Sequence, residues 1–304
     1  MKDPTDRPDR STGRGLSMDL LYEAPLAASP GGLRGGPLPA DLAARYGPGL
    51  AIPLRADGPT LIANFVSSLD GVVSLGPEAS AGGGEISGFF EPDRFVMGLL
   101  RSLADAIVVG AGTLRAAPHH EWTPRRVNRT WTDAYAAWRR DLGLASPQPT
   151  TIVVSGRGEL DPRHPALSAP DVPVIVLATA EGARRLAGQA FSSSVRVVVA
   201  GPGERVESQA IVDVLAAEGV RLALVEGGPR LMGQLVDAGA IDELFLTVAP
   251  QVLGRGGAEV RPSFAEGMGF QAAGGQWGQL RSIRRAGSHV FLRYAFDPRR
   301  PSSR

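Results

Sequence analysis

Glu226 is followed directly by two glycines and a proline, within the stretch RLALVEGGPRLMGQ from Arg221 to Gln234. The apolar run before the acid predicts a strand, and the apolar spacing after Pro229 predicts a helix. Gly227 and Gly228 leave room for a ligand to approach the backbone, and the helix start suits an anion such as a nucleotide pyrophosphate. Glu226 would then lie in the crevice where open α/β sheets bind ligands. The alternative is that the glycines only turn the chain.

Two other predicted strands end in groups that can meet a ligand. The strand from Leu61 to Ser67 runs into SSLDG, in which Ser68 and Asp70 are either ligand-binding groups or an Asx-type hydrogen-bonded turn. The strand from Ala106 to Val109 runs into the glycine turn Gly110–Thr113, whose hydroxyl and N–H groups suit phosphate or amide edges. Two glycine turns at the carboxyl ends of parallel strands can line one crevice.

A guanidinium follows the strand predicted from Thr150 to Val154. Ser155 and Arg157 stand just beyond its end. This is a suitable place for the 2′-phosphate that distinguishes NADPH from NADH. The alternative for Arg157 is a solvated loop cation.

Composition excludes several kinds of chemistry. The 304 residues contain no cysteine, which excludes disulfides, thiolate zinc sites, cysteine nucleophiles and iron–sulfur ligation. A net charge of +1 provides no general attraction to nucleic acid or to an anionic membrane. No apolar stretch has membrane-spanning length, and the start MKDPTDRPDR lacks the apolar core of a signal peptide. We therefore expect a cytoplasmic protein.

Histidine, tryptophan and arginine side chains follow one another in the long loop or insertion predicted for residues 118–149. His119, His120, Trp122 and Arg125 are placed to face a substrate. Adjacent histidines do not share a helix face and no third ligand is near, so we expect no metal site.

Strands and helices alternate along the chain, which predicts an α/β fold with a mostly parallel sheet. The further strands predicted are Val172–Leu177, Val195–Val199 and Ile241–Val248. The predicted helices are Pro92–Leu103, Thr132–Leu142, Glu181–Gly188 and Ser208–Ala217. Gln276–Arg285 and Ser288–Phe296, turned at Ala286-Gly287, predict an antiparallel C-terminal edge.

The chain divides into three parts. Residues 1–58 are predicted to be an N-terminal extension, disordered up to about Gly15 and holding a short helix from Leu38 to Tyr46. Residues 59–297 form the compact domain, and residues 298–304 form a tail. Within the domain, the loop from Gly76 to Gly88 is expected to be flexible and able to close over a ligand.

The order of five motifs resembles one family. The motifs are VSSLDG (Val66–Gly71), LLRSLADAIVVGAGT (Leu99–Thr113), VVSGR (Val153–Arg157), LVEGGPRL (Leu224–Leu231) and DELFLTVAPQVLG (Asp242–Gly254). In this order they look like the reductase half of the bifunctional riboflavin-biosynthesis deaminase/reductase, from about Leu61 to Phe296. The resemblance implies a dihydrofolate-reductase-like three-layer α/β fold, NADPH as cofactor and a homodimer.

The resemblance also implies a reaction and a set of site residues. The reaction would be hydride transfer from NADPH that converts the ribose of 5-amino-6-(5-phosphoribosylamino)uracil to a ribityl chain. NADPH would be held at the strand ends and glycine turns, by Val66, Gly110, Gly112, Thr113, Ser155, Arg157, Gly227, Gly228, Pro229, Arg230 and Leu231. Substrate would meet Ser68, Asp70, Arg101 and Glu226. Asp70 and Glu226 are the catalytic candidates, because a carboxylate can assist proton movement.

The sequence departs from the family pattern on the substrate side. Val72 stands where the family often has a basic residue, and Ala117 stands where an aspartate follows the glycine turn. Arg125 is a candidate replacement for the arginine that holds the substrate phosphate. These departures keep open a dihydrofolate or pteridine reductase, or a non-catalytic NADPH-binding protein. The cysteine motif of the deaminase half cannot exist here, so any deamination belongs to another protein.

Overall fold

The main sheet of the computed structural model is mixed, as predicted. The structure describes residues 15–26, 29–76, 83–256, 261–270 and 275–297. Ten strands lie in the order β1-β11-β12-β10-β4-β9-β5-β6-β7-β8. They are β1 (Asp19–Glu23), β4 (Thr60–Ser67), β5 (Ala106–Gly110), β6 (Thr150–Val154), β7 (Val174–Ala178), β8 (Val195–Val199), β9 (Leu222–Val225), β10 (Glu243–Val248), β11 (Gly278–Ala286) and β12 (His289–Phe296). Pairing is parallel from β10 to β8 and antiparallel from β10 through β12 and β11 to β1.

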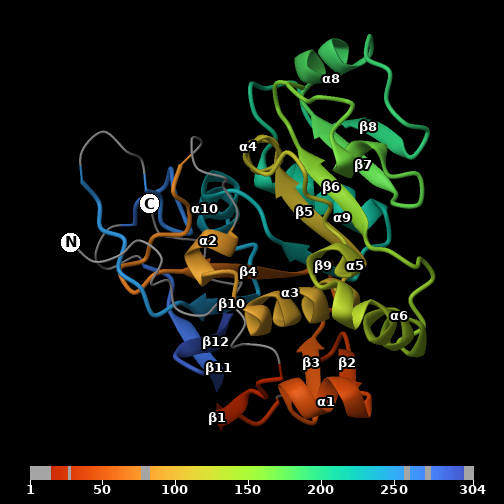
Figure 1. The fold of residues 1–304 in the computed structure, drawn as a ribbon. Helices are drawn as coiled ribbons and strands as arrows, with labels where there is room; N and C mark the ends of the chain where they lie inside the picture. The colour runs from red at the N-terminus through yellow and green to blue at the C-terminus, as the bar shows by residue number, and fades with distance from the viewer. Residues whose placement is uncertain (1–14, 27–28, 77–82, 257–260, 271–274, 298–304) are drawn as a thin grey trace.

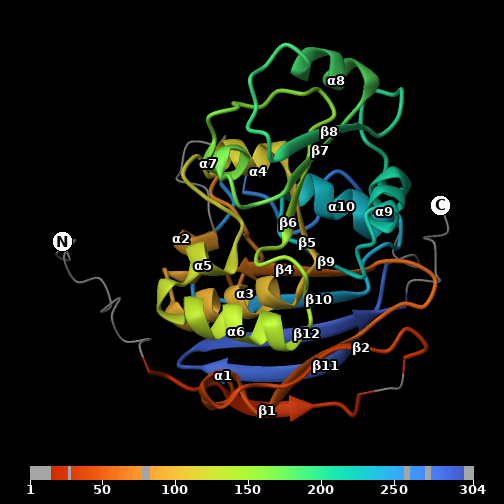
Figure 2. The same cartoon turned by 90° about the vertical axis from the view of Figure 1, so that its right-hand side faces the viewer.

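Helices cover both faces of this sheet (Figures 1 and 2). On one face lie α3 (Glu91–Leu103) and α6 (Thr132–Asp141), and on the other lie α9 (Ser208–Ala217) and α10 (Pro229–Asp237). The α/β prediction with three layers is therefore confirmed.

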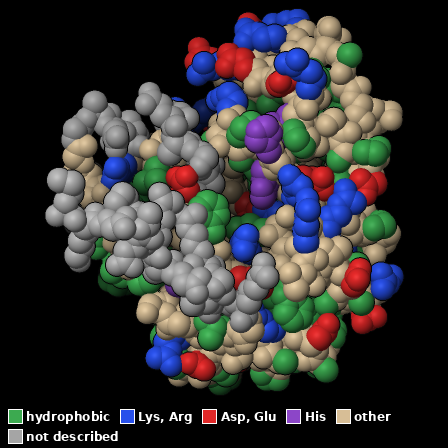
Figure 3. Space-filling model, in the orientation of Figure 1, with side chains coloured by type: hydrophobic (Ala, Val, Ile, Leu, Met, Phe, Trp, Pro, Cys, Tyr) green, Lys and Arg blue, Asp and Glu red, His purple; other side chains and the backbone are tan. Residues whose placement is uncertain are grey.

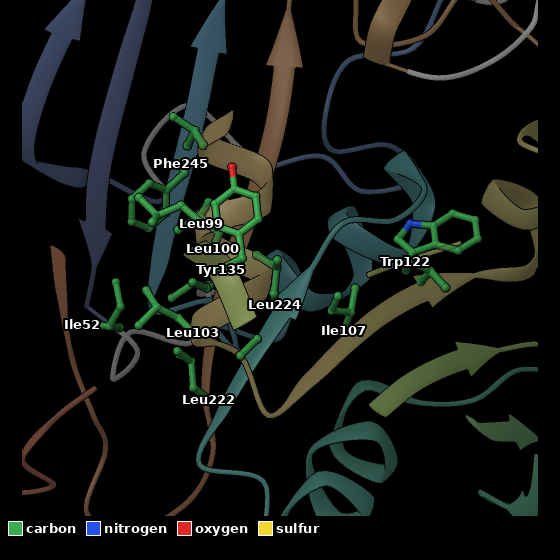
Figure 4. Close-up of a cluster of buried hydrophobic side chains, with 14 of the residues drawn as sticks. Ile52, Leu99, Leu100, Leu103, Ile107, Trp122, Tyr135, Leu222, Leu224 and Phe245 are labelled. Carbon is green, nitrogen blue, oxygen red and sulfur yellow. The ribbon is translucent and has the colours of Figure 1, made fainter. Parts of the chain in front are cut away.

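The alternation of side chains explains why the central strands are apolar at almost every position. Ile107 and Val109 of β5 join the core beneath α3, whereas Ala106 and Val108 join the core beneath α10. A parallel strand that is buried on both faces needs apolar residues on both. Figure 4 shows the first core, in which the leucines of α3 pack with side chains of β5, β9 and β10.

The N-terminal part of the chain is built into this fold. It contains β1, α1 (Ala40–Tyr46) and a two-stranded sheet of β2 (Leu33–Pro37) with β3 (Gly49–Pro53). Arg34 binds both carboxylate oxygens of Asp105 at 2.9 and 3.2 Å, and Arg45 binds Glu91. The helix expected at Leu38–Tyr46 is present, whereas β1 is an outer strand of the main sheet that the sequence did not predict. Residues 1–14, expected to be disordered, and the tail at 298–304 lie outside the described residues.

Short helices replace two segments predicted as loops or turns. Within the loop expected from Gly76 to Gly88, residues Gly83–Ser87 form α2, and residues 77–82 lie outside the described part. The glycine turn after β5 opens α4 (Ala111–Ala116). The other short helices are α5 (Pro124–Val127), η1 (Arg129–Trp131), α7 (Pro165–Ser168) and α8 (Ala180–Leu186).

The first turn of α3 holds a buried acid, Asp93, which is 4% exposed. Burial raises its pKa to about 6, against the opposing hydrogen bonds from Thr247 and Ser87. The folded state therefore binds the proton more tightly than the unfolded state, so stability falls as pH rises from about 4 to above 6.

We expect Asp93→Asn to raise the free energy of unfolding by about 1–3 kcal/mol at pH 8 and to change it little at pH 4. Asparagine keeps one acceptor oxygen and carries no charge to bury. Urea denaturation at both pH values measures the difference. Asp133→Asn, at an exposed position in α6, is the control. An equal effect of Asp93→Asn at both pH values would show that the carboxyl does not titrate in this range.

Candidate functional site

The carboxyl ends of four adjacent strands bring the predicted site residues together. In the sheet, β4, β9, β5 and β6 are neighbours and run parallel. Ser68, Glu226, Gly110 and Ser155 therefore lie at one edge, although they come from widely separated parts of the sequence. Figure 3 shows a hollow on this face with acidic, basic and histidine side chains around it.

The glycine turns after β9 and β5 are in direct contact. Gly228 has φ of 69°, in the left-handed region that favours glycine. A Cβ on Gly227 would lie 2.7 Å from the Cα of Val109, and one on Gly228 would lie 3.2 Å from Oγ1 of Thr113. Gly227 needs glycine because backbone atoms of β5 occupy the space, and Gly228 needs glycine because of its positive φ.

The first turn of α10 has backbone N–H groups that are available to a ligand. No side chain caps it, and Pro229 at its first position has no N–H. Met232 is the first residue of the helix whose N–H bonds back, to the oxygen of Gly228. The N–H groups of Arg230 and Leu231 have no hydrogen-bond acceptor in the described part of the chain. These donors and the glycines fit a phosphate group.

Glu226 and Arg101 form a buried ion pair at the centre of the site. Nε of Arg101 lies 3.0 Å from Oε1 and 3.1 Å from Oε2 of Glu226, and Nη2 lies 2.6 Å from Oε2. The side chains are 1% and 5% exposed. Arg101 also donates to the oxygen of Thr123 at 3.1 Å. The structure thus places Arg101, a predicted substrate residue, behind Glu226, where it fixes the carboxylate.

Ser68 and Asp70 form the hydrogen-bonded turn that was the alternative to a ligand role. Oγ of Ser68 donates to Asp70 at 2.6 Å and accepts from the N–H of Val72. The Asp70 carboxylate also accepts from the N–H groups of Leu253 and Gly254, at 3.1 and 2.7 Å. The hydrogen bond from Ser68 and those from the backbone lower the pKa of Asp70 to about 2. Asp70 is therefore ionised at neutral pH and cannot donate a proton there.

The remaining cofactor candidates differ in their accessibility. Arg157 follows β6 with a side chain 77% exposed, and its distance to the carboxylate of Glu159 is 4.0 Å. Ser155 is buried next to it, and Gly112 lies on the surface of α4. The side chain of Val66 is buried in an apolar cluster beneath α2.

Two arginines after α4 differ in their ion pairs. Arg125, the candidate for the substrate phosphate, binds Glu121 at 3.0 Å and also pairs with Asp171. The bond to Asp171 is the main cause that raises its pKa. Arg126 donates to the oxygen of His119 at 3.3 Å and has no carboxylate partner in the described ranges. Nothing in the sequence marked Arg126 as the more accessible cation, because ion pairing across 46 positions leaves no local signal.

Among the described residues, no helix is long and apolar enough to cross a membrane. No group of three or more histidine, aspartate or glutamate side chains is placed to hold a metal ion in that part of the chain.

Comparison with known proteins identifies the family and the fold. The RibD C-terminal domain family matches residues 59–292. The pyrimidine reductase-like protein of Corynebacterium diphtheriae superposes with a TM-score of 0.59 at 23% identity, over 79% of this chain and 92% of that one. Riboflavin biosynthesis reductase Rib7 of Saccharomyces cerevisiae gives 0.51 at 18% identity, over 79% and 90%. No curated protein matched in sequence.

The bifunctional enzymes are longer than the matched region. The diaminohydroxyphosphoribosylaminopyrimidine deaminase/5-amino-6-(5-phosphoribosylamino)uracil reductase of Thermotoga maritima superposes with a TM-score of 0.58 at 17% identity. The match covers 79% of this chain and 57% of that protein. At these identities the superpositions establish a shared fold.

Proposed function

Because this chain belongs to the RibD C-terminal domain family, we propose that it is an NADPH-dependent reductase of 5-amino-6-(5-phosphoribosylamino)uracil or a related pyrimidine. The observation that carries the proposal is the meeting of two glycine turns with the Arg101–Glu226 pair at one edge of the sheet. This arrangement would place a phosphate-binding turn beside a fixed carboxylate. The turn would bind a nucleotide cofactor, and the carboxylate would bind a polar substrate.

The residues at the strand ends fit the parts of NADPH. The N–H groups of Arg230 and Leu231 at the start of α10, together with Thr113, would hold the pyrophosphate. Ser155 and the exposed Arg157 would hold the 2′-phosphate. When bound, NADPH supplies the hydride.

The protein's own contribution is to orient the reactants and exclude water. Glu226, fixed by Arg101, would accept hydrogen bonds from the substrate. Asp70 would act as a fixed negative charge that ties the loops after β4 and β10 together, because its low pKa prevents it from carrying a proton at neutral pH. We also expect a homodimer, which sedimentation can test.

We expect Arg157→Ala to weaken NADPH binding about tenfold and NADH binding little, because one charge-assisted hydrogen bond to the 2′-phosphate is lost. Cofactor fluorescence titration measures both dissociation constants. Arg163→Ala removes another exposed arginine, which is paired with Asp161, and serves as the control. Equal weakening of both cofactors by Arg157→Ala would remove its 2′-phosphate role.

We propose that Arg126 contributes to the site for the substrate phosphate, since Arg125 is already paired with two carboxylates. Arg126→Ala is expected to raise the KM for the phosphorylated pyrimidine about tenfold and to leave the KM of the dephosphorylated compound unchanged. Arg125→Ala serves as the comparison. It should change the KM values of the phosphorylated and dephosphorylated compounds by more similar factors. A larger and phosphate-dependent effect of Arg125→Ala would assign the phosphate to Arg125 instead.

NADPH oxidation by the pure protein tests the proposed function. The deaminated phosphoribosylaminopyrimidine and dihydrofolate are offered in parallel, with NADH as the control cofactor. Preferential turnover of the pyrimidine supports the proposal. Turnover of dihydrofolate alone would mean that the changes at Val72 and Ala117 accompany a different substrate. Tight NADPH binding without turnover of either would favour a binding role.

A further inference from the structure

One nitrogen of Arg101 holds two groups of the site. Nη2 lies 2.6 Å from Oε2 of Glu226 and 3.1 Å from Nε2 of His120. A guanidinium has only donors, so Nε2 of His120 must accept this hydrogen bond and carries no proton. The position of the imidazole proton therefore follows from the contact.

His120 is neutral in this setting. Burial lowers its pKa to about 3, and the positive charges of Arg101 and Arg126 act in the same direction. A neutral imidazole whose Nε2 has no proton carries it on Nδ1.

The resulting Nδ1–H group is free to bind. It has no acceptor among the residues that the structure describes, and it is not among their buried side-chain atoms without a partner. The residue as a whole is partly exposed. His120 thus presents a single uncharged donor at the site.

Trp122 holds the imidazole ring in place. The centroids of the two rings are 4.8 Å apart with an edge-to-face angle of 72°. Trp122 is itself buried and also stacks on the ring of His164, which is bound to backbone oxygens of Leu114 and Ala117. The donor therefore has a defined position before any ligand arrives, which favours selective recognition.

We propose that His120 is a specificity-determining residue whose Nδ1–H donates to a neutral acceptor, a carbonyl oxygen or ring nitrogen, of the substrate. The inference rests on the proposed function and names the part of the substrate that this donor would recognise. Glu226, on the same guanidinium, supplies an acceptor next to it. A donor beside an acceptor matches the N–H/C=O edge of a pyrimidine ring, and a ligand that lacks either group leaves its partner unpaired.

The first test follows the four histidines of the protein by ¹⁵N NMR in the absence of substrate. Single His→Gln variants assign the signals. We expect His120 to remain neutral with its proton on Nδ1 between pH 5 and 8. A proton on Nε2, or protonation of both nitrogens in this range, would overturn the inference. Addition of the product, 5-amino-6-(5-phosphoribitylamino)uracil, should shift the Nδ1–H signal.

The second test distinguishes a hydrogen-bond donor at His120 from a ring that only fills space. His120→Leu should raise the KM for the pyrimidine about 10- to 100-fold with little change in kcat, since one hydrogen bond to the substrate is lost. His120→Asn offers an N–H close to the same place and should recover most of the KM. Both variants should keep the wild-type affinity for NADPH and the wild-type melting temperature.

The outcomes separate this inference from the proposed function. A wild-type protein that turns over the pyrimidine while His120→Leu keeps its KM would refute the role of His120. A wild-type protein that reduces no substrate would refute the proposed function. In that case the inference about His120 stands if the product shifts its Nδ1–H signal, and falls if it does not.

Discussion

Replacing Arg101 with methionine is expected to lower the free energy of unfolding by about 3–5 kcal/mol, because the Glu226 carboxylate is left buried without its cation. The pair is almost fully buried, and both carboxylate oxygens accept from the guanidinium. Turnover should also disappear, since Glu226 and His120 lose the group that positions them. Urea denaturation and the NADPH oxidation assay measure the two effects.

A second substitution distinguishes an uncompensated charge from lost packing. The double variant Arg101→Met/Glu226→Gln has no unpaired carboxylate at this position, so it should recover a large part of the stability but none of the activity. Arg163→Met, which removes a side chain 90% exposed, should change stability by less than about 0.5 kcal/mol. A loss below about 1 kcal/mol for Arg101→Met would mean that water reaches the pair.

Gly228→Ala is expected to weaken NADPH binding about 10- to 100-fold. The new Cβ would lie 3.2 Å from Oγ1 of Thr113, in the space between the two glycine turns where a phosphate would approach the backbone. The backbone conformation of Gly228, with φ of 69° and ψ of 124°, adds a cost of roughly 1–3 kcal/mol to folding when the residue carries a side chain. Cofactor titration and thermal melting follow the two effects separately.

A glycine elsewhere in the chain provides the matched control. Gly219 has φ of 70°, and a Cβ added there would have no described atom within 4 Å, so Gly219→Ala also places a side chain at positive φ, but away from the site. It should lower stability and leave the affinity for NADPH unchanged. If both variants lose the same affinity for NADPH, the loss results from lower stability, and the proposed phosphate site at Gly228 is wrong.

Local sequence signals predicted the central part of the site. The strand, glycine turn and helix between Arg221 and Gln234 are encoded within a few residues of one another, so spacing and turn chemistry were sufficient. The meeting of four strand ends followed from the parallel arrangement. The roles of the individual residues at these ends remain predictions.

Features that depend on distant parts of the chain were missed. Strand β1 is largely exposed and pairs Asp19 with Arg285, 266 positions away, so no periodic burial pattern marked it. Asp93 looks like an ordinary acid in a first helical turn, and only contact with α2 and β10 buries it. The sequence also could not show that Arg101 pairs with Glu226, and the substrate role that the resemblance implies for Arg101 stays a prediction.

The transfer of a labelled hydride tests the central claim most directly. The protein is incubated with NADPH that carries deuterium at the transferring position of the nicotinamide C4, together with the deaminated phosphoribosylaminopyrimidine. Mass spectrometry then locates the label in the product. We predict one deuterium on the reduced sugar carbon, with much less labelled product from Gly228→Ala at limiting cofactor and none from Arg101→Met. A product without deuterium, or no product despite bound NADPH, would contradict the assignment of this chain as a reductase of the pyrimidine.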